Sequence, residues 1–211
     1  MRTAFAIVTL FLITIGASKR AAAEGRIGVD ACGGWNGYSM QAFKETMSSF
    51  NRDVGADVPA IHDGGSWDLG LRLWPHPDWR IRLGFEDLNA QSEGSGVKFD
   101  LGVHAYTFGV AWFAPTNNPL RFGIGAAVGP HSAHGGLDVP GATLRSSGDG
   151  FGGQVAGEVM VPLSRGWSVN GAMGYRWMTI DHLKLNGSSD GLKPQYDGVL
   201  LQIGIAVDET R

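Results

Sequence analysis

The sequence predicts an all-β protein: an eight-stranded antiparallel up-and-down transmembrane β-barrel with one short helix in its first long connection. Three observations support this prediction. Eight segments carry a bulky apolar residue at every second position, the connections between them alternate between long and short, and tryptophans stand beside the short ones. Period-two alternation is typical of strands, and tight turns on one rim with long loops on the other are typical of barrels that cross a membrane.

The chain opens with a segment typical of export signals. An apolar run from about Thr3 to Ala17 follows Arg2, and three alanines precede Glu24. This pattern predicts a secretory signal peptide at residues 1–23, which leaves residues 24–211 as one barrel domain. The apolar run is too short to span a membrane as a helix. The remaining chain is mildly acidic and has no basic run, which argues against a nucleic-acid partner.

The eight alternating segments give the expected strands. They are residues 25–34, 65–74, 79–88, 97–113, 120–129, 150–161, 167–180 and 198–207. Most are close to the roughly 9 to 11 residues that a tilted strand needs to cross a bilayer. In 97–113 the bulky residues change parity from Tyr106 onward, which predicts a β-bulge near Ala105. Because Cys32 is the one cysteine, the fold is held by packing and hydrogen bonds and not by an internal disulfide.

The connections between the strands differ in length in a regular way. The short ones are residues 75–78, 114–119 and 162–166, and the long ones are 35–64, 89–96, 130–149 and 181–197. Two prolines in the first short connection remove backbone donors, which suits a turn and excludes a sheet interior. The sequence therefore predicts short periplasmic turns and longer outer loops.

Aromatic residues flank the short connections and are expected to form a periplasmic girdle. The girdle residues are Trp74, Trp79, Trp112, Phe113 and Trp167. Aromatic rings with a polar edge suit the boundary between an apolar band and water. Trp79 shares the register of the lipid-facing residues, whereas Trp74 shares the register of Arg72. Trp74 is therefore expected to turn at the strand end, unless a bulge resets the register there.

The strand face without large apolar residues carries glycine and charge, and it is expected to line the lumen. The predicted lumen charge network is Asp30, Asp68, Arg72, Arg80, Arg82, Glu86, Asp100, Glu158 and Arg176. Parity brings Arg72 opposite Arg80 or Arg82, a like-charge pair that needs acids nearby. Unpaired charges in a confined interior would cost several kcal/mol each, so ion pairing is expected. A paired network predicts a plugged lumen in preference to a conducting pore.

The first long connection contains the one helical pattern of the mature chain, in YSMQAFKETMSSFNRD. Apolar residues recur there at gaps of three, four and three, at Met40, Phe43, Met47 and Phe50. Two interpretations stay open. The helix forms a lid or a partner-binding element at the cell surface, or it packs its apolar stripe onto the barrel rim, which is the favoured interpretation.

On its signal peptide, strand count, loop asymmetry and aromatic girdle, the chain resembles the small eight-stranded outer-membrane barrels of the OmpA, OmpX and OmpW type. The resemblance implies a monomer in the outer membrane of a Gram-negative bacterium, with outer-membrane lipid and the barrel-assembly machinery as partners. One feature departs from this pattern. Such barrels usually end in an aromatic residue, whereas here the strand VLLQIGIAV continues into residues 208–211.

No catalytic, cofactor or metal site is predicted. His131 and His134, with Asp138 nearby, fall in the third long connection, but their spacing matches no zinc or triad pattern. The expected function is a non-enzymatic barrel with a plugged lumen and surface loops for structural or interaction roles. Two alternatives stay open: a barrel enzyme that modifies outer-membrane lipid, and a soluble periplasmic carrier of lipocalin type with its apolar wall inside.

Overall fold

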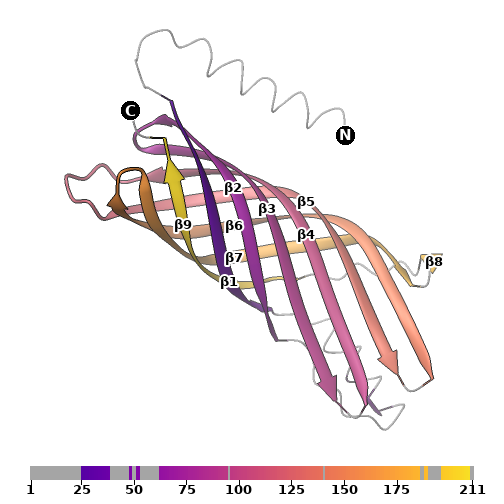
Figure 1. The fold of residues 1–211 in the computed structure, drawn as a ribbon. Helices are drawn as coiled ribbons and strands as arrows, with labels where there is room; N and C mark the ends of the chain where they lie inside the picture. The colour runs from indigo at the N-terminus through magenta and orange to yellow at the C-terminus, as the bar shows by residue number, and fades with distance from the viewer. Residues whose placement is uncertain are drawn as a thin grey trace.

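The computed structural model describes residues 25–38, 48, 51–52, 62–94, 96–139, 141–185, 188–189 and 196–209. In this part of the chain, eight long strands form the wall of a barrel (Figure 1): β1 (Arg26–Tyr38), β2 (Asp63–His76), β3 (Trp79–Gly94), β4 (Val97–Phe113), β5 (Arg121–Val139), β6 (Ala142–Ser164), β7 (Trp167–Leu185) and β9 (Gly198–Asp208). The two-residue β8 (Ser188–Ser189) pairs with the end of β7. No helix among the described residues is long and apolar enough to cross a membrane.

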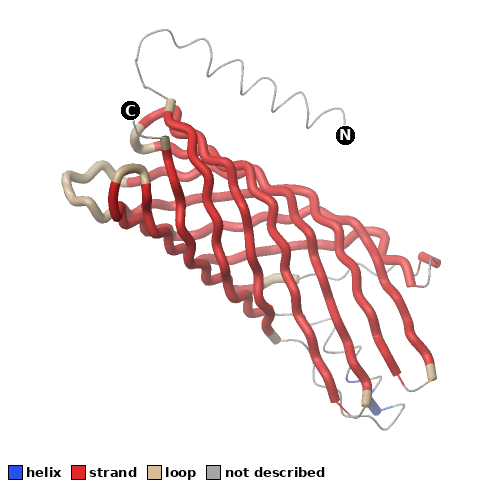
Figure 2. The backbone as a smooth tube through the Cα atoms, in the orientation of Figure 1, coloured by secondary structure: helices blue, strands red, loops and turns tan. Residues whose placement is uncertain are grey.

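The strands follow one another around the wall in chain order. Each pairs antiparallel with the next from β1 to β7, and β9 closes the ring between β7 and β1. Closure gives each of the eight described long strands a paired neighbour on both sides, which is how a barrel satisfies its backbone hydrogen bonds without water. Figure 2 shows that strand structure makes up nearly all of the described chain. The predicted all-β, eight-stranded antiparallel barrel is confirmed.

The period-two pattern separates two walls. In β2 the outward side chains of Leu69 and Leu71 are about half exposed, whereas inward Asp68 and Arg72 are buried. The same alternation runs through β1 and β9, where Val29 and Ile205 face out and Asp30 and Ala206 face in. The barrel therefore carries its bulky apolar residues outside and its charges inside.

Along β3 the inward and outward positions keep alternating past the apolar band, but there the outward side chains are polar and the inward ones mostly apolar. Leu83 and Phe85 lie on the outward face, and the next outward residue is Asp87. On the inward face, Glu86 is followed by Leu88 and Ala90, which are 1% and 4% exposed. These two belong to an apolar interior cluster made of Tyr38, Leu88, Ala90, Leu101, Val103, Ala133, Met178, Ile180 and Tyr196. Beyond the apolar band, the wall is thus built like that of a water-soluble barrel, with a mainly apolar interior and a polar exterior.

This reversal explains why the predicted bulge near Ala105 is wrong. The pairing of β3 with β4 runs in one register from Trp79 opposite Trp112 to Gly94 opposite Val97. Ala105 faces inward and Tyr106 outward without a break in that register. The bulky residues of β4 lie on the inward face as far as Ala105 and on the outward face from Tyr106 to Trp112, where the outer wall becomes apolar. The backbone stays regular across this change.

Two of the predicted long outer loops are mostly strand. Residues 89–94 extend β3, and the pairing of β5 with β6 continues to Val139 opposite Ala142. Tight turns end both hairpins at Gly96 (φ 76°) and Gly141 (φ 88°), backbone angles that glycine adopts at little steric cost. Beyond the apolar band, the outward residues of these strands are polar, and their amino-acid composition resembles that of a loop. The sequence therefore predicts these strands to be shorter than they are. Both hairpins project at the lower right of Figure 1.

Two further expectations fall on other parts of the chain. The predicted signal peptide at residues 1–23 lies outside the described residues. The apolar stripe of the predicted helix, Met40, Phe43, Met47 and Phe50, also lies outside them. Ser48, Asn51 and Arg52 are described and are helical, but these three residues do not establish the helix or its stripe. The helix therefore stays a prediction.

Candidate functional site

The centre of the barrel holds an ion-pair cluster contributed by three adjacent strands. Arg82 of β3 donates from Nε to both carboxylate oxygens of Asp30 in β1, each at 3.0 Å, and from Nη2 to Asp30 Oδ1 at 2.6 Å. Its Nη2 also donates to Asp68 of β2. The side chains of Asp30 and Asp68 are each 4% exposed. A Cβ on Gly70 would overlap the Arg82 guanidinium and Asp30, so a larger residue there would displace these side chains.

A second cluster crosses the lumen. Arg176 of β7 donates to both oxygens of Glu86 in β3 at 2.7 Å, and to the side-chain oxygens of Asn36 and Gln154. Gln202 of β9 donates to Asp68 at 3.1 Å and to Glu86 at 3.3 Å. Gln202 therefore joins the two clusters into one network, and the guanidinium of Arg176 ties opposite sides of the barrel together.

Two more arginines extend the network toward the end of the barrel where the Pro77–Asp78 and Arg165–Gly166 turns lie, which we call the turn end. Arg80 pairs with Glu158 of β6 at 2.6 Å. Arg72 is fully buried and lies 3.4 Å from Asp208 and 3.9 Å from Asp30. Arg72 is directly opposite Arg82 in the β2–β3 register, the predicted like-charge pair, and Asp30 between them offsets the repulsion.

The structure brings together all of the predicted network residues except Asp100. Asp100 lies on the outward register of β4, opposite Gln91 and Gly136, so its placement in the lumen was wrong. Past the apolar band most inward side chains are apolar, so assigning strand faces from side-chain polarity alone fails there. The predicted network also left out Asn36, Gln154, Gln202 and Asp208. For Gln154 and Gln202, their inward strand parity was the signal in the sequence that could have identified them.

The aromatic residues of the turn end divide between the two walls. Trp79, Trp112 and Trp167 face outward and are 47%, 39% and 46% exposed, as expected of a girdle. Trp74 and Phe113 are 2% and 0% exposed and pack against each other inside, with ring centroids 5.4 Å apart. Their assignment to the girdle was wrong, because strand parity holds through Trp74 in β2 and Phe113 in β4.

Trp74 and Phe113 fill the lumen at the turn end. Trp74 Nε1 donates to Asp208 Oδ1 at 3.2 Å, and the guanidiniums of Arg72 and Arg121 each lie 5.3 Å from its ring centroid. Asp208, placed by the sequence in a tail after the last strand, is the residue that ends β9 and accepts this bond. The carboxylate at the last position of β9 therefore holds the Trp74 side chain in the lumen.

A fluorescence experiment is expected to distinguish the two kinds of tryptophan. In vesicles containing brominated lipid, which quenches indoles that contact acyl chains, Trp79→Phe should reduce the quenchable emission, because Trp79 faces outward. Trp74→Phe should leave the quenchable emission unchanged, because Trp74 is enclosed. Equal losses from both substitutions would mean that Trp74 reaches the lipid.

The free volume within the network is small. The described residues enclose cavities of about 60 Å³, beside Asp30, Cys32 and Asp68, and about 40 Å³, beside Arg80 and Thr107. A cavity needs roughly 10–15 Å³ of such volume to hold one water, so each cavity has room for only a few waters. Farther along the lumen the side chain of His131 is buried.

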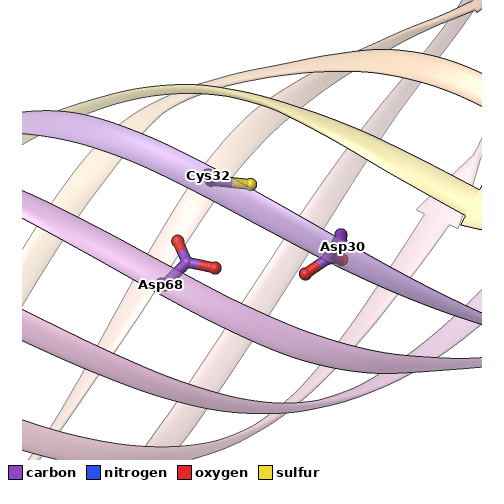
Figure 3. Close-up of side chains that lie close together, drawn as sticks. All are labelled: Asp30, Cys32 and Asp68. Atoms are coloured by element: carbon purple, nitrogen blue, oxygen red, sulfur yellow. The ribbon is translucent and has the colours of Figure 1, made fainter.

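Asp30, Cys32 and Asp68 form a compact group that resembles a metal site (Figure 3). Their ligand atoms all lie within 4.8 Å of one another. Both oxygens of Asp30 already accept from Arg82, and the oxygens of Asp68 accept from Arg82 and Gln202. A cation here would have to displace a guanidinium, so the geometry suits an ion-pair cluster better than metal binding.

Comparison with known proteins identifies the fold. No protein-family model and no curated protein sequence matches this chain. Neisserial surface protein A is similar in structure, with 15% identity and a TM-score of 0.53 over 86% of this chain and 96% of that one. The outer membrane protein OprG from Pseudomonas aeruginosa has 13% identity and a TM-score of 0.52 over 89% and 97%. Ail, the attachment invasion locus protein of Yersinia pestis, has 9% identity and a TM-score of 0.55 over 88% and 99%.

At these identities the likeness establishes the fold alone. The chain has the fold of the small outer-membrane β-barrels, which is the fold that the sequence resemblance implied. It spans almost the full length of each of these three barrels, so the whole architecture is shared.

Proposed function

We propose that the protein is a non-enzymatic barrel of the outer membrane of a Gram-negative bacterium, with a lumen closed by ion pairs and an outer end available for structural or interaction roles. The observation that carries the proposal is the contrast between the two walls. Large apolar side chains cover the outside of the barrel, and paired charges fill its centre.

The outer apolar band supports a location in lipid. Outward side chains that are about half exposed or more include Ile27, Val29, Leu69, Leu71, Leu83, Ile124, Ile203 and Ile205, which come from strands around the ring. Continuous apolar surface of this extent is unfavourable in water and favourable in a bilayer. Outer-membrane lipid is therefore the proposed partner of this wall, and the girdle tryptophans mark its periplasmic edge.

The same contrast argues against the soluble-carrier alternative. A lipocalin-like carrier holds an apolar ligand inside a barrel whose outer wall faces water. Here the central interior contains Arg82, Asp30 and Asp68, and the apolar interior cluster beyond them is closely packed. This lumen does not suit an apolar ligand.

The contacts across the lumen support a closed barrel. The Arg176–Glu86 pair spans it at the centre, Trp74 and Phe113 fill its turn end, and the cavities between them have room for only a few waters. The enzyme alternative would need a serine, a histidine and an acid that converge at the outer rim. His131 is buried inside the wall and His134 is exposed on the outside, so these two histidines do not contribute to one site.

Cell fractionation and gel migration test the proposal. The protein is expected in the outer-membrane fraction, and unboiled samples should migrate differently from boiled ones because closed barrels resist detergent until they are heated. In planar bilayers the folded barrel should show no steady conductance. Recovery in the soluble periplasmic fraction would contradict the membrane location, and stable open channels would contradict the closed lumen.

A further inference from the structure

We propose that His104 and His134 form a binding site for a divalent transition-metal ion on the outside of the barrel, just beyond the apolar band. His104 lies on β4 and His134 on β5, at neighbouring outward positions. In the β4–β5 register, His134 is opposite Gly102, two residues from His104 on the same face. Neither histidine takes part in the lumen network, so this site is independent of the proposed function.

The separation of the two rings suits a shared ion. The centroids of the His104 and His134 imidazoles are 5.2 Å apart, with an angle of 31° between the ring planes. Metal–nitrogen bonds of about 2.0–2.1 Å in a tetrahedral arrangement place two imidazole centres about 5 Å apart. Two ligands on adjacent strands of a closed barrel are also held at a fixed spacing by the sheet.

Neighbouring residues hold both rings in place. A Cβ on Gly102 would overlap the His134 ring, so the glycine leaves the space in which this imidazole lies beside His104. On the other side of His104, the ring of Phe85 stacks at a centroid distance of 6.0 Å and an angle of 21°. The pair is therefore ordered before a ligand arrives, which lowers the entropic cost of binding.

Asp87 of β3 is placed to orient His104. Its Oδ2 lies 3.5 Å from His104 Nδ1, a nitrogen that makes no hydrogen bond in the structure, and the two residues are directly opposite in the β3–β4 register. A carboxylate beside one ring nitrogen favours a proton on that nitrogen and leaves the other nitrogen free to bind a metal. Asp87 is thus a positioning residue, and His104 Nε2 is the ligand atom.

The ligand set indicates the class of ion. Imidazole nitrogens prefer Zn²⁺, Ni²⁺ or Cu²⁺ over Mg²⁺ or Ca²⁺, which prefer oxygen ligands. Two protein ligands leave coordination positions open to water or to anionic groups at the membrane surface. Such a site binds weakly and exchanges its ion, unlike a closed structural zinc site.

Calorimetric titration of the folded, untagged barrel in detergent with ZnCl₂ tests the site. The Cys32→Ser background removes the thiol as a competing ligand. One Zn²⁺ per barrel is expected, and His104→Ala and His134→Ala should each weaken binding by about tenfold or more, because each removes one ligand. Asp87→Asn should weaken binding by about tenfold and leave the stoichiometry unchanged.

His76→Ala is the matched control. His76 also has a carboxylate partner, with its Nδ1 3.8 Å from Asp78 Oδ2, but it lies at the turn end and has no second histidine in the β2–β3 hairpin. This variant should bind Zn²⁺ like the parent, and MgCl₂ should produce no binding heat. Absence of Zn²⁺ binding by the parent, or binding that survives either His104→Ala or His134→Ala, would overturn the proposal. The migration of unboiled samples confirms that each variant is folded.

Discussion

Arg82→Ala is expected to lower the free energy of unfolding by about 3–5 kcal/mol, the range observed when one partner of a buried ion pair is removed. Arg82 is the common donor to Asp30 and Asp68, whose side chains are each 4% exposed. Without the guanidinium, two carboxylates would face each other in the lumen. A urea titration of the barrel in lipid vesicles, with unfolding followed by tryptophan fluorescence, measures the loss.

Two control variants separate the lost ion pair from a general effect of losing an arginine. Arg165→Ala removes an exposed arginine in the turn before β7 and should change the unfolding free energy by less than about 1 kcal/mol. Adding Asp30→Asn and Asp68→Asn to Arg82→Ala removes the unpaired charges and should restore part of the loss. A change below about 1 kcal/mol for Arg82→Ala itself would mean that the lumen is wet enough to screen these charges.

The sequence was sufficient to predict the fold and the central ion-pair network, because both depend on a period-two pattern within the apolar band. There, a residue between two large apolar neighbours faces inward, and a narrow interior obliges its charges to pair. The assignments of Asp68 and Arg82 follow directly from this rule, and Asp30 and Glu86 share the same parity along their own strands. All four residues lie in the network.

The errors in Asp100 and in the strand ends have one physical cause, the end of the apolar band. Where the outer wall meets water, apolar side chains move inside, so Asp100 was placed in the lumen and strand residues 130–139 were taken for a loop. At the turn end, Trp74 and Phe113 were assigned by residue type although their parity placed them inside. The assignment of Asp100 could not be corrected without knowing how far the strands extend beyond lipid, whereas parity alone would have placed Trp74 inside.

A pair of arginine substitutions on β3 tests where the band ends. Leu83 faces outward in the middle of the band and is 53% exposed. Leu83→Arg should lower the unfolding free energy by about 2–4 kcal/mol in lipid vesicles, the range for an arginine near the midplane of a bilayer. Leu83→Ala should cost much less, because alanine loses apolar contact with lipid but adds no charge.

Gln91→Arg is the matched control, since it places the same side chain on the same face of the same strand. Gln91 is exposed and lies beyond Asp87, where the outer wall is polar, so an arginine there stays in water. Its effect on the unfolding free energy should be close to zero, as for most exposed surface substitutions. The difference between the two variants measures the step from lipid to water along β3. Equal effects at both positions would show that the polarity reversal between Phe85 and Asp87 does not coincide with the membrane surface, and that the outer wall is in one solvent throughout.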